Sequence, residues 1–281
     1  MTSFFRRSLV GIFLMLVFFT YSLQLHAQSV DAQALFMQGQ ELIAQEKYAE
    51  AIAVFDTLDQ RFGNNPQPEI RNMIISSMLW KSALLKSTGD IRATIAVYDR
   101  IEKRYGKDKT IEIQEKVLEA LGDKVYLQIE ALDDPAGSLK TIERILKNYC
   151  VEPLSQDIRF SCVHTQQNSI EPLLAVGKTA QAIKTIKSVR AAELETFAET
   201  DDAVLSFLLW LADPGQITPQ TLFDAIISLE ETPEAGNWTF NMTRNHVIAR
   251  LSEPRKTQAT CFADYFEKYQ DSDLLERCLT R

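Results

Sequence analysis

Glycine and proline are scarce in this sequence, whose 281 residues contain ten Gly and nine Pro. Loop-rich β-sandwiches need many turn residues, so this scarcity argues against them and favours long regular elements. After residue 27, no stretch of strand length alternates apolar and polar residues with the period of two that marks a half-buried strand. Hydrophobic residues make up 46% and charged residues 24%, which are the proportions of a folded protein. The composition therefore predicts a protein built from helices.

Motifs that carry chemistry are also missing. After residue 27 the only histidines are His164 and His246, and neither belongs to an H-E-x-x-H motif or to a paired metal-ligand spacing. No phosphate-binding or dinucleotide-binding glycine loop occurs, and no G-x-S-x-G. Cys162 and His164 are two residues apart, which on a helix turns them in different directions. Carboxylates are scattered among lysines, and no pair stands out as acid and base. We predict no enzyme, with no catalytic residue, no cofactor and no metal site.

Positive charge is in deficit, because the formal net charge is −8 at pH 7. Such a chain lacks the electrostatic footprint of a protein that binds nucleic acid or an anionic membrane surface. A basic partner is one interpretation of the acidic balance, and solubility is the simpler one.

Residues 1–27 differ from the rest. Arg6 and Arg7 precede an uninterrupted apolar run from Leu9 to Phe19, and a small residue, Ala27, closes the segment. This layout predicts a cleaved secretory signal peptide. The apolar run is about half of the roughly 20 residues that a membrane-spanning helix needs, so an uncleaved anchor is the weaker alternative. We expect a mature chain that starts at Gln28, has no membrane anchor, and is periplasmic or secreted.

All four cysteines follow this segment, at Cys150, Cys162, Cys261 and Cys278. An even number in an oxidising compartment suggests two disulfides. Three connectivities are possible, of which the pairing of sequence neighbours, Cys150–Cys162 and Cys261–Cys278, is the most economical. No C-x-x-C is present, so the bridges are expected to be structural.

A pattern of one small and one large residue recurs along the chain. "AEAIAVFDTLDQRFG" (49–63) aligns with "RATIAVYDRIEKRYG" (92–106), and three further copies, the last of them weaker, follow at spacings of 43 or 44. The small position is filled by Ala51, Thr94, Ser138, Ala182 and Ala225. Four residues later stands a large one: Phe55, Tyr98, Ile142, Ile186 and Leu229. Repeats at such a period indicate stacked supersecondary units, and the apolar spacing within each unit is helical. Each unit is therefore expected to be a helical hairpin, with a first helix (A), a tight turn and a second helix (B).

The segment "ALFMQGQELIAQEKYAEAIAVF" resembles a tetratricopeptide (TPR) repeat, on the residues Leu35, Gly39, Leu42, Tyr48, Ala51 and Phe55. The period is longer than the 34 residues of the standard unit, as in long-helix bacterial variants, and a HEAT-like array is the alternative. The resemblance implies a right-handed α-α superhelix of about five hairpins. It places Gly39 and Ala51 at the close crossing of the two helices, and Tyr48 and Phe55 in the gaps between hairpins.

This organisation predicts three parts: a signal peptide (1–27), TPR-like repeats (28–234) and a C-terminal helical cap (235–281). TPR proteins bind ligands on the inner face, which by the resemblance includes Phe36, Gln40, Leu79, Trp80 and Ala83. Because these are mainly apolar or small, a carboxylate clamp of Lys, Arg and Asn is not expected.

The predicted function is an exported scaffold or assembly factor that binds another protein or peptide through apolar and aromatic contacts. Two alternatives remain. One is a secreted effector-associated protein. The other is a solenoid-bodied enzyme of envelope polysaccharide metabolism, which would need paired buried carboxylates in a cleft.

Overall fold

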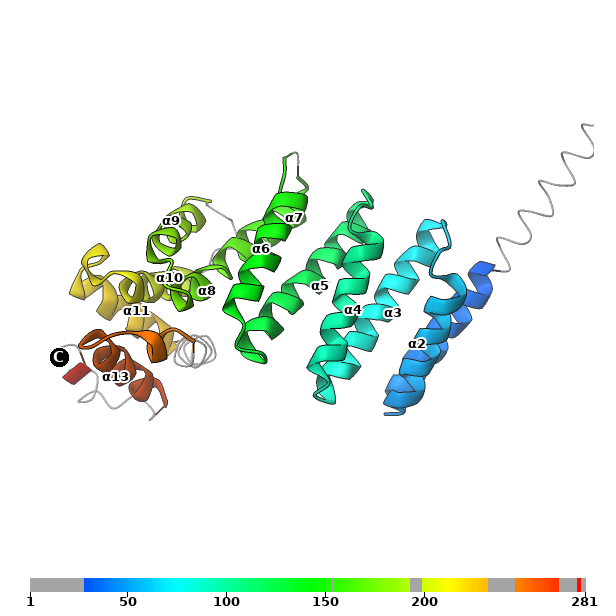
Figure 1. The fold of residues 1–281 in the computed structure, drawn as a ribbon, viewed down its shortest axis with the longest axis horizontal. Helices are drawn as coiled ribbons and strands as arrows, with labels where there is room; N and C mark the ends of the chain where they lie inside the picture. The colour runs from blue at the N-terminus through cyan, green and yellow to red at the C-terminus, as the bar shows by residue number, and fades with distance from the viewer. Residues whose placement is uncertain (1–27, 153, 193–198, 232–245, 268–276, 279–281) are drawn as a thin grey trace, which may run out of the picture. The chain divides into compact units, whose positions relative to one another are not determined.

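The computed structural model describes residues 28–152, 154–192, 199–231, 246–267 and 277–278 (Figure 1). The expected signal peptide and residues 235–245, 268–276 and 279–281 of the expected cap lie outside the described residues. Every regular element in these ranges is a helix. Within them, no helix combines the length and the apolar character that crossing a bilayer requires. The chain divides into two compact units, 1–117 and 118–281, with the division inside helix α5 (Ile111–Glu130).

The first unit consists of consecutive antiparallel helices. It contains a helix over residues 28–44, then α2 (Tyr48–Phe62), α3 (Pro68–Ser87), α4 (Ile91–Tyr105) and the start of α5. Helix α3 packs against both α2 and α4. Part of the core of this first unit is formed by Ala51, Phe55 and Leu84, with Phe36 packed against them. At the turn before α4, the Asp90 side chain accepts a hydrogen bond from the backbone N–H of Ala93, which satisfies one of the unpaired donors of the helix N-terminus.

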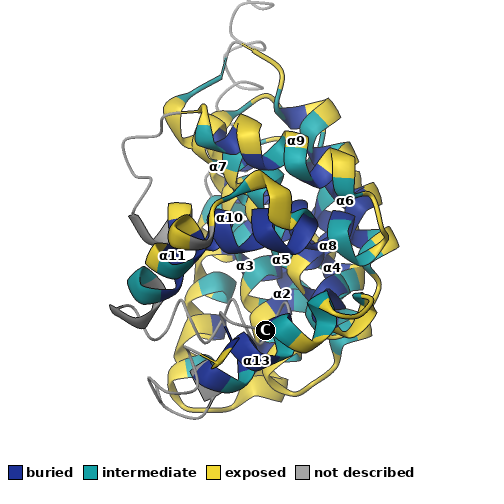
Figure 2. Ribbon diagram, turned by 90° about the vertical axis from the view of Figure 1, so that its left-hand side faces the viewer, coloured by how far each residue is buried: buried dark blue, intermediate teal, exposed yellow. Residues whose placement is uncertain are grey.

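The second unit begins with the rest of α5 and continues the hairpin pattern. Its elements are α6 (Pro135–Tyr149), α7 (Gln156–Gln167), α8 (Ile170–Ala175), α9 (Thr179–Arg190), α10 (Glu199–Ala212), η1 (Pro214–Gln216), α11 (Pro219–Glu231), η2 (Ile248–Arg250) and α13 (Arg255–Glu267). Helix α6 packs against α7 and α8, and α10 packs against α9 and α11. Residues 203–212 of α10 are buried (Figure 2). Trp210 lies in this core, with ring centroids 5.8 Å from Phe207 and 5.4 Å from Phe262.

In one hairpin, the first helix is interrupted. Helices α3 and α5 each run for 20 residues without interruption, but the corresponding span of the next repeat is divided between α7 and α8. Pro172 lies just after the break, and its ring nitrogen has no hydrogen to donate to the carbonyl of Asn168, so a continuous helix would lose that bond. The Ser169 hydroxyl instead donates to the Gln166 carbonyl at 2.6 Å. The short helix α8 carries Glu171 into the interior of the second unit, where it is 5% exposed.

The small position of the repeat is buried in each hairpin. The exposed fraction is 0% at Ala51, Thr94, Ser138 and Ala182, and 6% at Ala225. The two hydroxyls at this position are satisfied within their own helices, since Thr94 donates to the Asp90 carbonyl at 2.8 Å and Ser138 to the Pro135 carbonyl at 2.9 Å.

The large position is also buried. Phe55, Tyr98, Ile142 and Ile186 are at most 2% exposed, while Leu229 lies outside the residues whose side chains are described. Gly39 is buried against Phe55: a Cβ atom on Gly39 would lie 2.2 Å from Cε1 of Phe55. Tyr48, the first residue of α2, is 40% exposed, so only part of its ring is available to fill a gap between hairpins.

Both disulfides join sequence neighbours. Cys150, directly after α6, is bonded to Cys162 of α7, and Cys261 of α13 is bonded to Cys278. Within the described residues no cysteine is free. Within the described residues, the prediction of an all-α fold made of consecutive helical hairpins is confirmed.

Candidate functional site

The predicted partner-binding residues lie on the A helices of the first unit, where they differ in exposure. Trp80 is 44% exposed, and Gln40 and Ala83 are also exposed. Phe36 and Leu79 are half-buried, and Phe36 packs towards Phe55 with 6.4 Å between ring centroids. The exposed part of this set is therefore one large aromatic side chain with small or polar neighbours.

A second exposed apolar residue belongs to the same face and was missed by the sequence analysis. Met37 is 58% exposed, and it precedes Trp80 by 43 positions, the same spacing that separates Ala51 from Thr94. The two residues thus occupy equivalent positions in successive A helices. The repeat period was the signal that could have paired them.

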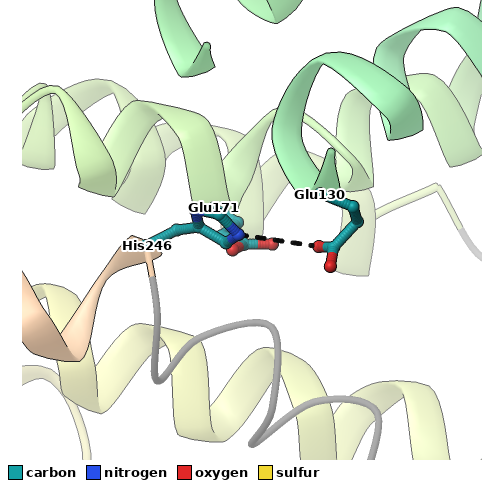
Figure 3. A group of neighbouring side chains, drawn as sticks. All are labelled: Glu130, Glu171 and His246. Atoms are coloured by element: carbon teal, nitrogen blue, oxygen red, sulfur yellow. Dashed lines mark ion pairs between the residues drawn. The ribbon is translucent and has the colours of Figure 1, made fainter. Parts of the chain in front are cut away.

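A different group of side chains meets inside the second unit. Glu130 is the last residue of α5, Glu171 lies in α8, and His246 lies just before η2 (Figure 3). One potential ligand atom from each residue lies within 4.8 Å of the others. His246 Nε2 is 3.9 Å from Oε1 of Glu130. Three segments that are far apart in the sequence therefore bring two carboxyl groups and an imidazole together.

Two of these residues are buried, and within the described part of the chain the carboxyl groups of the cluster lack hydrogen-bond partners. Glu171 and His246 are each 5% exposed. Both carboxyl oxygens of Glu171 and Oε1 of Glu130 are buried without a hydrogen-bond partner among the described residues. Since nearly all buried polar atoms in proteins have a partner, three such oxygens in one place require an explanation.

The orientation of the His246 ring is fixed through its second nitrogen, Nδ1, which faces away from Glu130. Its Nδ1 is 3.0 Å from Oδ1 of Asp133, an acceptor, so Nδ1 carries the hydrogen. Arg250 holds that carboxylate in place, with Nη2 at 2.9 Å and 3.2 Å from its two oxygens, and also donates to the His246 carbonyl. The Nδ1 contact leaves Nε2 on the side of the ring that faces Glu130.

The electrostatics of the cluster follow from burial. Desolvation, assisted by the negative charge of Glu130, raises the pKa of Glu171 to about 8, against the opposing effect of Arg250. Burial also raises the pKa of Glu130, which the nearby His246 partly counteracts. The pKa of Asp133 is lowered, first by the hydrogen bond from Arg250 and then by that from His246. The interior thus disfavours two bare carboxylates, and either a proton or a cation would relieve them.

Neither this acidic pair nor a metal ligand was predicted from the sequence. The three residues are 41 and 75 positions apart, so no short motif contains them. The one local signal was Glu171-Pro172, a charged residue and a helix breaker within an otherwise helical pattern. The other histidine, His164, is exposed and stacks on Phe160, and the disulfide of Cys162 removes the thiol that a thiol–imidazole pair would need.

No family model matches the sequence, and no curated protein is similar to it. A solved structure, a tetratricopeptide repeat protein from Parabacteroides merdae, aligns over 89% of this chain and 99% of its own with 12% identity and a TM-score of 0.32. At that TM-score the likeness adds nothing to the hairpin fold that is seen directly in this chain.

Proposed function

We propose that the protein is an exported TPR-like scaffold that binds another protein and carries out no reaction of its own. The observation that carries this proposal is the pair Met37 and Trp80, which are 58% and 44% exposed at equivalent positions of successive A helices. Exposing large apolar side chains to water is unfavourable, so a partner that covers them gains binding free energy from their burial. Repeat arrays bind partners along such faces because each repeat presents the same position in turn.

The chemistry of the face indicates the partner. Trp80 and Met37 offer an aromatic ring and a flexible thioether, with Gln40 and Ala83 beside them. Tryptophan is enriched among the residues that dominate binding energy, and methionine adapts to varied apolar shapes. We therefore expect an extended or helical segment with apolar side chains, and no requirement for a free carboxylate.

Photo-crosslinking tests this proposal. A photoreactive amino acid at position 80 should capture one partner from an envelope extract, whereas the same group at position 160 should not. Phe160 is the matched control because it is an aromatic side chain of similar exposure, 45%, in the other unit.

The captured partner then allows affinities to be measured. Trp80→Ala should weaken binding about 10-fold or more, and Phe160→Ala should leave it unchanged. Equal binding by wild type and Trp80→Ala would show that this face is not the interface.

Export is the second part of the proposal. It is supported by the layout of residues 1–27, and two disulfides are compatible with an oxidising compartment. Mass spectrometry of the protein from its native host should give a chain that starts at Gln28. Recovery from the periplasm would favour the scaffold, and recovery from the culture medium would favour the effector-associated alternative.

One observation favours the enzyme alternative: the carboxyl group of the half-buried Glu130 lies close to that of the buried Glu171. We place this function second, since Glu171 is 5% exposed and a glycosidase must bring both carboxyl groups against a sugar. Loss of a polysaccharide-hydrolysing activity in Glu171→Gln, with the helical content retained, would reverse that order.

A further inference from the structure

We propose that Glu130, Glu171 and His246 bind a divalent transition-metal ion, with Zn²⁺ as the best match. The site is independent of the partner-binding face, because all three ligands belong to the second unit and Trp80 and Met37 belong to the first.

The donor set selects the class of ion. One imidazole nitrogen and two carboxylate groups are ligands that Zn²⁺ and its first-row neighbours accept. Ca²⁺ takes six to eight oxygen ligands and Mg²⁺ prefers six, so an imidazole with two carboxylates suits neither. Cysteine ligands are not available here, since all four cysteines are in disulfides.

The surroundings of His246 are those of a metal ligand. A histidine that binds a metal through one nitrogen donates its other N–H to a carboxylate or carbonyl, which fixes the tautomer and raises the basicity of the ligand. His246 donates from Nδ1 to Asp133, and Arg250 fixes Asp133 by two hydrogen bonds. Nε2 is thereby left free to bind the ion.

A cation also explains the unsatisfied oxygens. Three buried carboxyl oxygens, two on Glu171 and one on Glu130, have no hydrogen-bond partner among the described residues. A metal ion that lies about 2.1 Å from each ligand atom would coordinate these oxygens and so replace the missing hydrogen-bond partners. Tetrahedral ligands at that distance are about 3.4 Å apart, so the donors, now within 4.8 Å of one another, have to move together by about 1 Å.

An ion can reach the site from solvent, and once bound it would hold three segments of the chain together. The Glu130 side chain is 25% exposed and that of Asp133 is 62% exposed, so an ion can enter from this side. Once bound, it links the end of α5, α8 and the segment before η2. The role of the ion is to fasten three segments together.

Isothermal titration calorimetry of the full chain tests the site. Protein purified without a polyhistidine tag is treated with a chelator, dialysed, and titrated with ZnCl₂. We expect one ion per chain with a Kd of about 1 μM or below, and a higher Tm in the presence of Zn²⁺ because the ion binds the folded state.

The variants identify the ligands. Glu171→Gln and His246→Gln should each weaken Zn²⁺ binding by at least about 10-fold, and Asp133→Asn by about 10- to 100-fold through the orientation of His246. Glu143→Gln and His164→Gln are the matched controls, since both residues are exposed, and they should bind as the wild type does. Far-UV circular dichroism of each metal-free variant checks that it is folded.

X-ray absorption of the wild-type Zn²⁺ complex tests the site without any variant. The expected shell contains one imidazole, carboxylate oxygens and no sulfur. The proposal is wrong if the chelator-treated chain shows no saturable Zn²⁺ binding, if Glu171→Gln binds with wild-type affinity, or if the shell contains no imidazole.

Discussion

Steric fit at the first close crossing ties the identities of two residues together. A Cβ atom on Gly39 would lie 2.2 Å from Cε1 of Phe55, and Phe55 is 1% exposed, so its ring has little room to move away. Ala51, which is 0% exposed, completes the contact region from α2. Only small residues at positions 39 and 51 allow the two helices to approach this closely.

Gly39→Ala should therefore lower the free energy of unfolding by about 1–3 kcal/mol, because the added methyl group forces Phe55 to shift. Gly122→Ala is the control. It lies inside helix α5, and a Cβ there meets nothing within 4 Å, so the loss of backbone freedom in the unfolded chain should stabilise the protein by about 0.5–1 kcal/mol. Urea denaturation measures both, and a change of the same sign in the two variants would contradict this account of the crossing.

Ala51→Leu and Ala182→Leu should each lower the free energy of unfolding by about 1–3 kcal/mol through overpacking, since both positions are fully buried. Ala53→Leu, on the exposed side of α2, should change it by no more than about 0.5 kcal/mol. A neutral effect at both buried positions would mean that they do not lie at helix crossings.

At the scale of elements, the connections between helices carry the specific polar contacts. Asp108, in the turn after α4, accepts a hydrogen bond from the Thr110 N–H at 2.9 Å and pairs with Arg71 of α3. Its side chain is 10% exposed. This carboxylate joins the connector that follows the α3–α4 hairpin to the first helix of that same hairpin.

The Asp108 contact should make stability depend on pH. Burial alone would raise the pKa of Asp108, but hydrogen bonds from Thr110 and the charge of Arg71 outweigh it and leave the pKa below its ordinary 3.8. The contribution is therefore fully present above pH 3.8 and is lost as the pH falls through the lower folded-state pKa. Asp108→Asn should lower the free energy of unfolding by about 1 kcal/mol at pH 7. The difference from wild type should shrink below about pH 3.8.

Guanidinium denaturation at several pH values measures this difference, with the exposed Glu143→Gln as a control that should follow the wild type throughout. A stability difference for Asp108→Asn that stays constant between pH 7 and pH 2.5 would show that ionisation of Asp108 does not contribute.

The Cys150–Cys162 disulfide fixes the end of α6 against α7 across a sequence separation of 12 residues. Replacing both cysteines with Ser should lower the free energy of unfolding by about 2–4 kcal/mol, since the unfolded chain gains the freedom of the opened loop. Peptide mapping without reductant should recover the two peptides as a linked pair from wild type. Unchanged stability of the double variant would mean that α6 and α7 are held by packing alone.

The helices were predictable from the sequence to different degrees. The hairpins around Ala51 and Thr94 were predictable because the apolar period, the small residue and the helix stop signal all indicate the same helix boundaries. The break between α7 and α8 was not predicted, because Ile158, Cys162 and Ile170 continue the apolar pattern across it. The Glu130–Glu171–His246 cluster could not be predicted, since its contacts depend on how distant helices pack. Sequence periodicity reports which side of a helix is buried, but not which buried polar groups meet.

At the scale of the whole molecule, the described helices of each unit pack mainly on their neighbours in sequence. Helix α3 packs on α2 and α4, and α10 packs on α9 and α11. In such an array, stability is approximately a sum of the stability of each repeat and its contacts with the next one. A local defect is therefore expected to stay local.

Hydrogen exchange can test this. Ala51→Leu should speed amide exchange in α2 and α3 while α9 and α10 keep their wild-type protection, and Ala182→Leu should give the reverse pattern. Each variant serves as the control of the other. Uniform loss of protection along the chain in either variant would show that the protein unfolds as one cooperative block.

The broken helix before Glu171 has a consequence for how this chain can evolve. Repeat arrays gain and lose whole hairpins by duplication and deletion, because each hairpin needs only its neighbours. Glu130 ends the first helix of the α5–α6 hairpin, Glu171 lies in the first helix of the next hairpin, and His246 comes from beyond α11. A duplication or deletion between them would carry one member of the cluster a full repeat away from the others. The number of hairpins between α5 and η2 is therefore set by the cluster, while the repeats before α5 are free to vary.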